Sequence, residues 1–194
     1  MQPQRGARLV AKAGAAYHPL MAVDVASLKI IHYPAPVLRK PSKHIPEITD
    51  EVREVAERML ELMHQAPGVG LAAPQVGLSW QMFVTCHTAD AADDRVFINP
   101  KLSNPGQASH DYDEGCLSLP EVTVKVRRPT EITIEATDLD GNPFTFTDAE
   151  LWSRVWQHEY DHLDGVLIID KMSPMDRLAN RKVIKGLEAA AAGN

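Results

Sequence analysis

The 194-residue chain has little of what disulfide-stabilised, membrane-spanning or nucleic-acid-binding proteins need. It has two cysteines, Cys86 and Cys116, which are too few for a disulfide framework. No apolar run of about 18 residues is present to form a membrane span. Acidic residues outnumber basic ones by 26 to 20, and this net charge of -6 argues against DNA binding. These absences favour a cytoplasmic protein with no membrane partner, built as one domain.

Residues 1–26 differ in composition from the remainder. They carry three basic residues, no acidic residue before Asp24, and no apolar core of the kind a secretory signal has. Two interpretations stay open, namely a disordered extension ahead of a start at Met21, or an organelle transit peptide. Serine and arginine are scarce for a transit peptide, which favours the first. We therefore expect a folded domain over 27–186 and a flexible tail over 187–194.

The most informative motif is H-E-x-x-H, formed by His158, Glu159 and His162. On a helix, residues four apart lie one turn above each other, so both imidazoles can face one metal ion with the glutamate beside it. The alternative is a chance pattern with two surface histidines near a glutamate. If the pattern is not chance, it indicates hydrolytic metal chemistry.

The flanking residues predict a helix from about 148 to 164. Thr147 and Glu150 match a capping box at its start. Helical spacing separates two apolar groups, with Leu151 and Val155 on the face of the histidines and Trp152, Trp156 and Leu163 on a face expected to be core.

A catalytic metal ion usually has three protein ligands and one position left for water. Cys116, within the sequence Glu-Gly-Cys-Leu-Ser at 114–118, is a candidate third ligand. A single cysteine is, however, more often a small buried apolar residue than a ligand. Cys86 ends an apolar strand-like run, and the side chain of His87 points to the opposite face of a strand, so we interpret Cys86 as structural.

A glycine-rich segment at 68–77 holds one polar side chain, Gln75. Glycines let a backbone approach a ligand closely, and a glutamine amide can donate a hydrogen bond to a developing oxyanion. The alternative is a tight connection with a solvated glutamine. No Gly-Lys-Ser/Thr follows, so the segment is not a phosphate-binding loop.

Taken in order, segments 68–75, 114–118 and 157–162 resemble the three signature motifs of the peptide deformylase family. The resemblance covers roughly 28–186. It implies an α+β fold in which antiparallel β-sheets surround a central metal-binding helix. It also implies a metal-dependent hydrolase that removes the N-formyl group from the N-terminal methionine of newly synthesised polypeptides and releases formate.

The resemblance also implies a role for each motif residue. It implies that Cys116, His158 and His162 are the metal ligands and that Glu159 is the general base. The implied oxyanion donors are the Gln75 side chain and the backbone N–H of Leu117. Ferrous iron is the family's metal, although one thiolate and two imidazoles also suit Zn²⁺, Ni²⁺ or Co²⁺.

The substrate that the resemblance implies is an N-formylmethionyl peptide. Its unbranched apolar side chain needs an apolar pocket, and Gly70 matches the position where the family's backbone pairs with the peptide. The expected pocket side chains are Val69, Tyr112, Leu151 and Val155. Thr123 stands where some members carry an arginine, so the preference beyond methionine is left open.

Glu114 and Arg128 match a pair that braces the cysteine loop in the family. The alternative interpretation of the two residues is a surface salt bridge, worth about 0 to 1 kcal/mol.

Periodicity and turn residues predict the other elements. Thr49 can cap a helix that runs to about Gln65. The expected strands and turns are strands 81–85, 95–98, 122–126, 131–137 and 166–169, with turns at Asn99-Pro100, 104–106 and 140–143.

The segment from Lys171 to Gly186 is rich in basic residues. It is either a solvated helix face or a docking surface for ribosomal RNA, because the family meets nascent chains at the ribosome. Two rival functions are a zincin-type endopeptidase, for which Glu188 is the remaining downstream ligand, and a non-catalytic module, which we would expect to lack Glu159 or a metal ligand.

Overall fold

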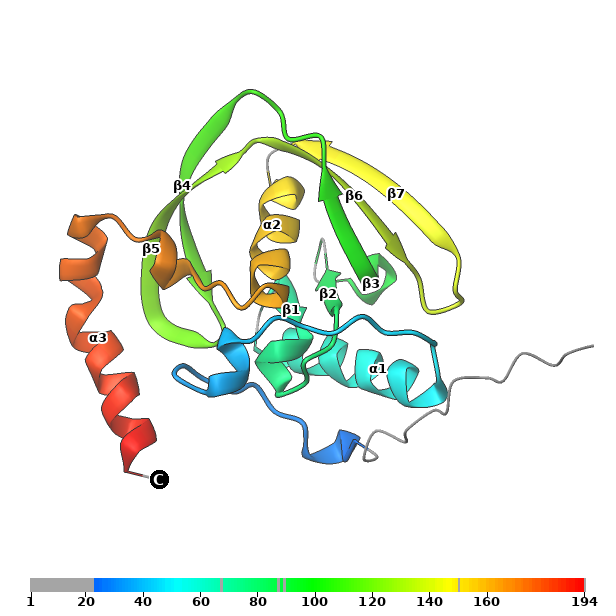
Figure 1. The fold of residues 1–194 in the computed structure, drawn as a ribbon, viewed down its shortest axis with the longest axis horizontal. Coiled ribbons are helices and arrows are strands. Elements are labelled where there is room, and N and C mark those ends of the chain that lie inside the picture. Colours follow the sequence, from blue (N-terminus) through cyan, green and yellow to red (C-terminus); the bar gives the residue numbers. More distant parts are fainter. Residues whose placement is uncertain (1–22, 67, 87, 89, 150, 194) are drawn as a thin grey trace, which may run out of the picture.

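The computed structural model describes residues 23–66, 68–86, 88, 90–149 and 151–193. Within these residues, helix α2 (Leu151–Leu163) lies between two antiparallel sheets, and helices α1 (Asp50–Gln65) and α3 (Pro174–Ala192) lie outside them (Figure 1). The five-stranded sheet has the order β1 (Gly70–Ala72), β2 (Met82–Cys86), β3 (Asp94–Ser103), β6 (Glu131–Thr137) and β7 (Pro143–Ala149), and the second sheet pairs β4 (Ser109–Cys116) with β5 (Leu119–Pro129). The expected α+β class is confirmed.

Short 3₁₀ helices connect these elements. They are η1 (Val25–Ser27), η2 (Pro36–Arg39), η3 (Ala73–Val76), η4 (Ala91–Asp93) and η5 (Ile168–Lys171). The last of them replaces the strand expected at 166–169. The apolar run is buried as expected, but the Asp170 N–H donates to the Leu167 carbonyl at 2.9 Å, and this bond closes a helical turn.

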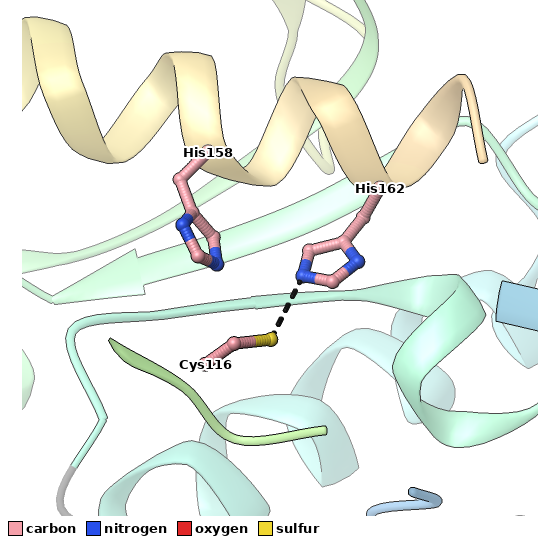
Figure 2. A group of neighbouring side chains, drawn as sticks. All are labelled: Cys116, His158 and His162. Carbon is pink, nitrogen blue, oxygen red and sulfur yellow. Dashed lines mark hydrogen bonds between the residues drawn. The ribbon is translucent and has the colours of Figure 1, made fainter. Parts of the chain in front are cut away.

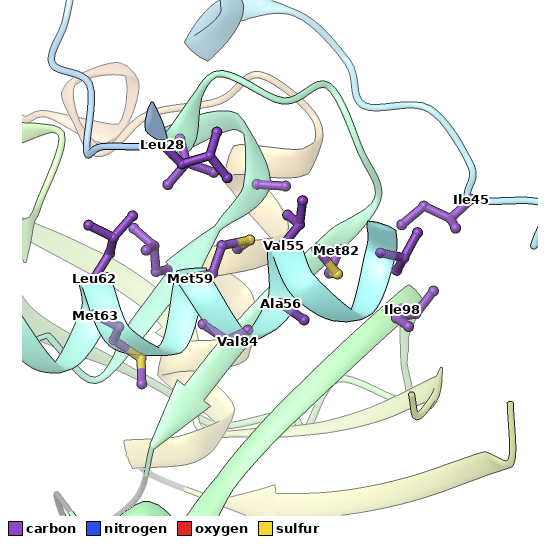
Figure 3. Packing of buried hydrophobic residues seen from close by; sticks show 14 of the residues in the cluster. Leu28, Ile45, Val55, Ala56, Met59, Leu62, Met63, Met82, Val84 and Ile98 are labelled. Carbon is purple, nitrogen blue, oxygen red and sulfur yellow. The ribbon is translucent and has the colours of Figure 1, made fainter. Parts of the chain in front are cut away.

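Helix α1 begins and ends where the sequence predicts. The Thr49 hydroxyl accepts a hydrogen bond from the Val52 N–H, and two acidic residues follow in the first turn, where they oppose the positive end of the helix dipole. Its apolar face packs against β1 and β2 in a buried cluster, part of which is drawn in Figure 3. This packing supports the glycine-rich segment, which includes β1.

Helix α2 begins later than the sequence suggests. Thr147 belongs to β7, where its hydroxyl is hydrogen-bonded to that of Thr133 on β6 at 2.9 Å, so the expected capping box is wrong. Glu150 lies outside the described residues. The face expected to be core is confirmed, since Trp156 and Leu163 are buried in a cluster with Phe83 and Phe97.

Asn99 and Pro100 lie inside β3 rather than at a turn. The pairing with β6 shifts register between Ile98 and Lys101, and Asn99 has φ +51°. The Asn99 side chain accepts from the Ile45 N–H and donates to the Ile45 carbonyl, both at 2.8 Å. The residue therefore makes a bulge that fastens the chain before α1 to the sheet.

Packing contacts continue past both expected domain boundaries. Residues 1–22 lie outside the described residues, but Val23 and Val25 already pack against the α1 cluster. At the other end, α3 continues to Ala192, and Leu187 packs against the cluster around β5, so residues 187–192 are helical.

Candidate active site

Helix α2 presents His158 and His162 on one face, one turn apart, with their ring centroids separated by 5.2 Å. Figure 2 shows both rings projecting from the helix toward Cys116. Because the opposite side of the helix is fixed by the aromatic core, the rings have a defined position.

Cys116 comes from the two-stranded sheet rather than from α2. It ends β4, immediately before the turn into β5, and its Sγ lies 3.3 Å from His162 Nε2. The ligand atoms of Cys116, His158 and His162 all lie within 4.8 Å of one another. The structure thus brings together the three residues that the sequence proposes as ligands.

This cluster fits a divalent metal ion by its chemistry. One thiol and two imidazoles are donors that Zn²⁺, Fe²⁺, Ni²⁺ and Co²⁺ accept. Burial lowers the pKa of His158, but hydrogen bonds to Cys116 and Glu114 and the charges of Cys116 and Glu159 outweigh burial and raise it to about 10.

A buried carboxylate orients the first histidine. His158 Nδ1 donates to Glu114 at 3.0 Å, which leaves Nε2 for the cluster. The same carboxylate accepts two hydrogen bonds from Arg128, at 2.7 and 2.9 Å, and one from Arg154 at 2.7 Å. Burial raises the pKa of Glu114, but the hydrogen bonds and charges of Arg128 and His158 hold it well below its usual range. Glu114 therefore stays ionised.

The Glu114–Arg128 pair is not the surface salt bridge of the alternative interpretation. The two side chains are 6% and 3% exposed. Arg128 also donates to Asp161 at 2.8 Å, and Asp161 in turn pairs with Lys171. The sequence reasoning missed the roles of Arg154 and Asp161, although Arg154 stands four residues before His158 and so shares its face.

Glu159 is buried beside the cluster, and its environment suits a base. Burial raises the pKa of Glu159 to about 7, against the opposing effect of the His158 and Arg128 charges. Among the described residues, no hydrogen-bond partner is found for its buried Oε2. A Cβ on Gly70 would stand 2.4 Å from Glu159 Oε1, so only glycine leaves room for the carboxylate.

Gln75 is held with its amide nitrogen toward the cluster. Its Oε1 accepts from the Ala72 N–H at 2.8 Å, and its Nε2 donates to Cys116 Sγ at 3.6 Å. The side chain is 1% exposed, so the solvated glutamine of the alternative interpretation is wrong. Leu117 follows Cys116 directly, and its side chain lies against Gly68.

These groups border a cavity of about 390 Å³. It is lined by all five residues expected to bind substrate, Val69, Gly70, Tyr112, Leu151 and Val155, together with Gln75, Cys116, Leu117, His158 and Glu159. Tyr112 and Leu151 are more than half exposed, so the cavity opens to solvent at that side.

Two residues named from the sequence lie elsewhere. Thr123 is exposed on β5 and is absent from the cavity lining, and its carbonyl accepts a hydrogen bond from Asn180 on α3. Glu188 accepts a hydrogen bond from the Tyr33 hydroxyl at 3.0 Å and does not join the cluster, which removes the zincin-type ligand set.

Comparison with known proteins identifies the family of this chain. The family model for polypeptide deformylase matches residues 27–178. The chain belongs to the polypeptide deformylase family. It is 40% identical over 161 residues to peptide deformylase of Acinetobacter baumannii (strain SDF), an alignment that covers 83% of this chain and 92% of that protein. It is 39% identical to that of Pseudomonas aeruginosa, covering 83% and 96%.

Solved deformylases have the same fold. A crystal structure of peptide deformylase from Plasmodium falciparum superposes with a TM-score of 0.83 at 33% identity, covering 86% of this chain and 98% of that chain. A plant peptide deformylase superposes with a TM-score of 0.81 at 35% identity, covering 85% and 91%.

The family's activity is therefore that of this chain. It is a metal-dependent hydrolase that removes the N-formyl group from the N-terminal methionine of newly synthesised polypeptides and releases formate. In the described part of the chain, none of the helices combines the length and the apolar character that crossing a membrane needs.

Proposed function

We propose that Cys116, His158 and His162 hold one divalent metal ion and that the residues around them carry out the deformylation. The observation that carries this proposal is the convergence of one sulfur and two imidazoles within 4.8 Å at the edge of a cavity. When bound, the ion supplies a Lewis acid and makes water a nucleophile near neutral pH.

Glu159 is the proposed general base. Its buried carboxylate takes a proton from the attacking water and later delivers one to the departing nitrogen, so that formate and a free amino terminus result. A pKa near 7 suits a group that must both accept and release a proton at neutral pH.

Gln75 and Leu117 are the proposed oxyanion donors. The carbonyl end of the Gln75 side chain is already bound by the Ala72 N–H, so its amide nitrogen is the end turned to the cavity. Together with the Leu117 backbone N–H, it would hold the formyl oxygen as negative charge develops there.

The methionine side chain would enter the cavity against Val155 and Leu151, with Val69 and Tyr112 at the rim. Strand β1 stands at the end of its sheet and pairs with β2, which leaves its other edge for a peptide. The substrate would then add beside Gly70 as a further strand.

The test of these roles is formate release from a formyl-methionyl dipeptide. In Glu159→Ala we expect turnover to fall by about 10²- to 10⁴-fold with the metal content unchanged, because the proton acceptor is lost while the ligands remain. Glu57→Ala, an exposed position on α1, is the matched control and should keep full activity. Undiminished turnover in Glu159→Ala would overturn the assignment.

For the metal, we propose Fe²⁺ as the native ion. An iron-loaded preparation should lose formate release on exposure to air, through oxidation of the iron or of Cys116, whereas a zinc-loaded preparation should not. Parallel anaerobic and aerobic time courses measure this. Equal and stable activity of iron-loaded protein in air contradicts the proposal.

We also propose that α3 contacts ribosomal RNA in the cytoplasm. One face of α3 packs against β5, and its exposed basic side chains lie outside that contact, namely Arg177, Arg181, Lys182 and Lys185. Lys171 does not belong to this set, because it pairs with Asp161.

Replacing these four residues with glutamine should weaken ribosome co-sedimentation at low salt and leave dipeptide turnover unchanged, since phosphate contacts are salt-dependent. Lys101→Gln with Lys125→Gln, both at exposed positions on strands, is the control. Unchanged co-sedimentation of the four-residue variant, or of a chain truncated after Ser173, rejects the contact.

A further inference from the structure

A second group of unlike metal-binding side chains lies outside the active site. His64 stands in the last turn of α1, Cys86 ends β2, and Asp94 begins β3. Their ligand atoms all lie within 4.8 Å of one another. His64 Nε2 is 2.9 and 3.2 Å from the two Asp94 carboxylate oxygens. Three separate elements thus direct an imidazole, a thiol and a carboxylate to one point.

The surroundings of these atoms suit an ion. Cys86 is 2% exposed, whereas the His64 and Asp94 side chains are 30% and 16% exposed. The sulfur therefore lies at the buried end of the group, and solvent reaches the other end, where a water ligand can complete four-coordination. The Asp90 carbonyl accepts a hydrogen bond from Cys86 Sγ at 3.4 Å, which places another oxygen beside the sulfur.

The spacing also suits an ion after a small adjustment. Tetrahedral Zn²⁺ with bonds of about 2.0 to 2.3 Å needs ligand atoms roughly 3.3 to 3.7 Å apart. The His64 and Asp94 atoms, which lie 2.9 Å apart, would separate slightly. The His64–Asp94 contact is an ion pair, and Cys86 adds a sulfur ligand atom within 4.8 Å of both side chains.

We propose that His64, Cys86 and Asp94 form a second metal site, which takes Zn²⁺ or a similar borderline divalent ion and has a structural role. The group lies outside the substrate cavity, whose lining contains none of the three residues. The proposal does not depend on the deformylation chemistry.

The position of the site gives it a structural consequence. The Cys86 N–H donates to the Val69 carbonyl at 3.1 Å, and Thr85 pairs with Gly70. The Gly68 N–H donates to the Met63 carbonyl at the end of α1. An ion joining α1, β2 and β3 would therefore fix the strand that carries the rim of the substrate cavity.

The test is the zinc content of the full chain after dialysis against buffered free Zn²⁺. The parent should bind two equivalents, and Cys86→Ser and Cys116→Ala should each bind one, because each variant keeps the other site. His44→Ala, which removes an exposed histidine, should still bind two. One equivalent in the parent, or two in Cys86→Ser, overturns the proposal.

A second variant keeps the proposal testable if Cys86→Ser fails to fold. Asp94→Asn keeps a side chain that can be hydrogen-bonded to His64 but removes the anionic ligand, and the second zinc should bind at least about 10-fold more weakly. Its zinc-free melting temperature should stay near that of the parent. In Cys116→Ala loaded with Co²⁺, a sulfur-to-cobalt absorption band should appear and should vanish when Cys86→Ser is added. Unchanged zinc affinity in Asp94→Asn, or a band that persists without Cys86, rejects the site.

Discussion

The two groups of metal-binding side chains differ in what surrounds them. Cys116 and His158 border a cavity and His162 lies beside them, with the buried Glu159 near by and a charged network behind His158. His64, Cys86 and Asp94 lie where the end of α1, the end of β2 and the start of β3 meet, outside that cavity. Donor atoms alone can bind an ion, whereas hydrolysis also needs room for substrate, a base and oxyanion donors.

The largest effect that tests this contrast concerns the charged network. Arg128→Met should lower the free energy of unfolding by about 3 to 5 kcal/mol, because Glu114 and Asp161 lose their buried partner. Urea denaturation measures it. The neighbouring Arg127, exposed and 3.8 Å from Asp111, provides the control, and Arg127→Met should cost less than about 1 kcal/mol. Equal costs for the two variants would show that the network does not brace the site.

The second effect concerns the oxyanion donors, which the second group lacks. Gln75→Ala should lower kcat by about 10²- to 10³-fold, the usual cost of one such donor. Steady-state formate release measures it, and Gln65→Ala, at the exposed end of α1, should leave kcat unchanged. A change in KM alone would assign Gln75 to substrate binding instead.

A third, smaller effect tests how closely the base is packed. In Gly70→Ala the new methyl group would meet Glu159 Oε1, and a displacement of roughly 1 Å can cost about 10²-fold in rate. We expect kcat to fall by 10- to 100-fold with the zinc stoichiometry preserved. Gly186→Ala, where an added Cβ meets nothing within 4 Å, should have no effect on kcat. Full activity in Gly70→Ala would mean that the carboxylate has room to move.

The smallest effect concerns the carboxylate of Asp138, which, unlike the buried Glu114, lies in a turn. Hydrogen bonds from Asn142, chiefly its backbone N–H, lower the pKa of Asp138 in the β6–β7 turn. A lowered folded-state pKa gives stability above the unfolded-state pKa that is lost as pH falls through the folded-state pKa. Melting temperature against pH should therefore fall slightly less steeply in acid for Asp138→Asn than for the parent. Identical acid limbs would contradict this.

Much of the site followed from the sequence because its residues lie in short contiguous motifs. The cap at Thr49 and the regular apolar spacing also gave α1 within a residue, and β6 was correct at both ends. Strand β4 was missed because it is polar and mostly exposed, so it lacks the alternation that predicts a strand.

Contacts between residues that are distant in sequence could not be predicted from the sequence. Arg154 and Asp161 act through Glu114 and Arg128, which the fold alone brings near. Cys86 was interpreted as structural from its apolar neighbours, because nothing local connects it to His64 or Asp94. Short motifs therefore predicted the proposed ligands, whereas the supporting contacts needed coordinates.

The two-stranded sheet has one further consequence. It delivers the sulfur from β4–β5, while α2, packed on the five-stranded sheet, delivers both imidazoles. A chelator would thus remove one link between α2 and the two-stranded sheet and leave the ion pairs of Glu114 and Arg128 in place. Amide hydrogens of residues 109–129 should then exchange faster in apo protein, while those of α2, sheltered by Trp156 and Leu163, should change little. Faster exchange in this hairpin would therefore report loss of the metal ion.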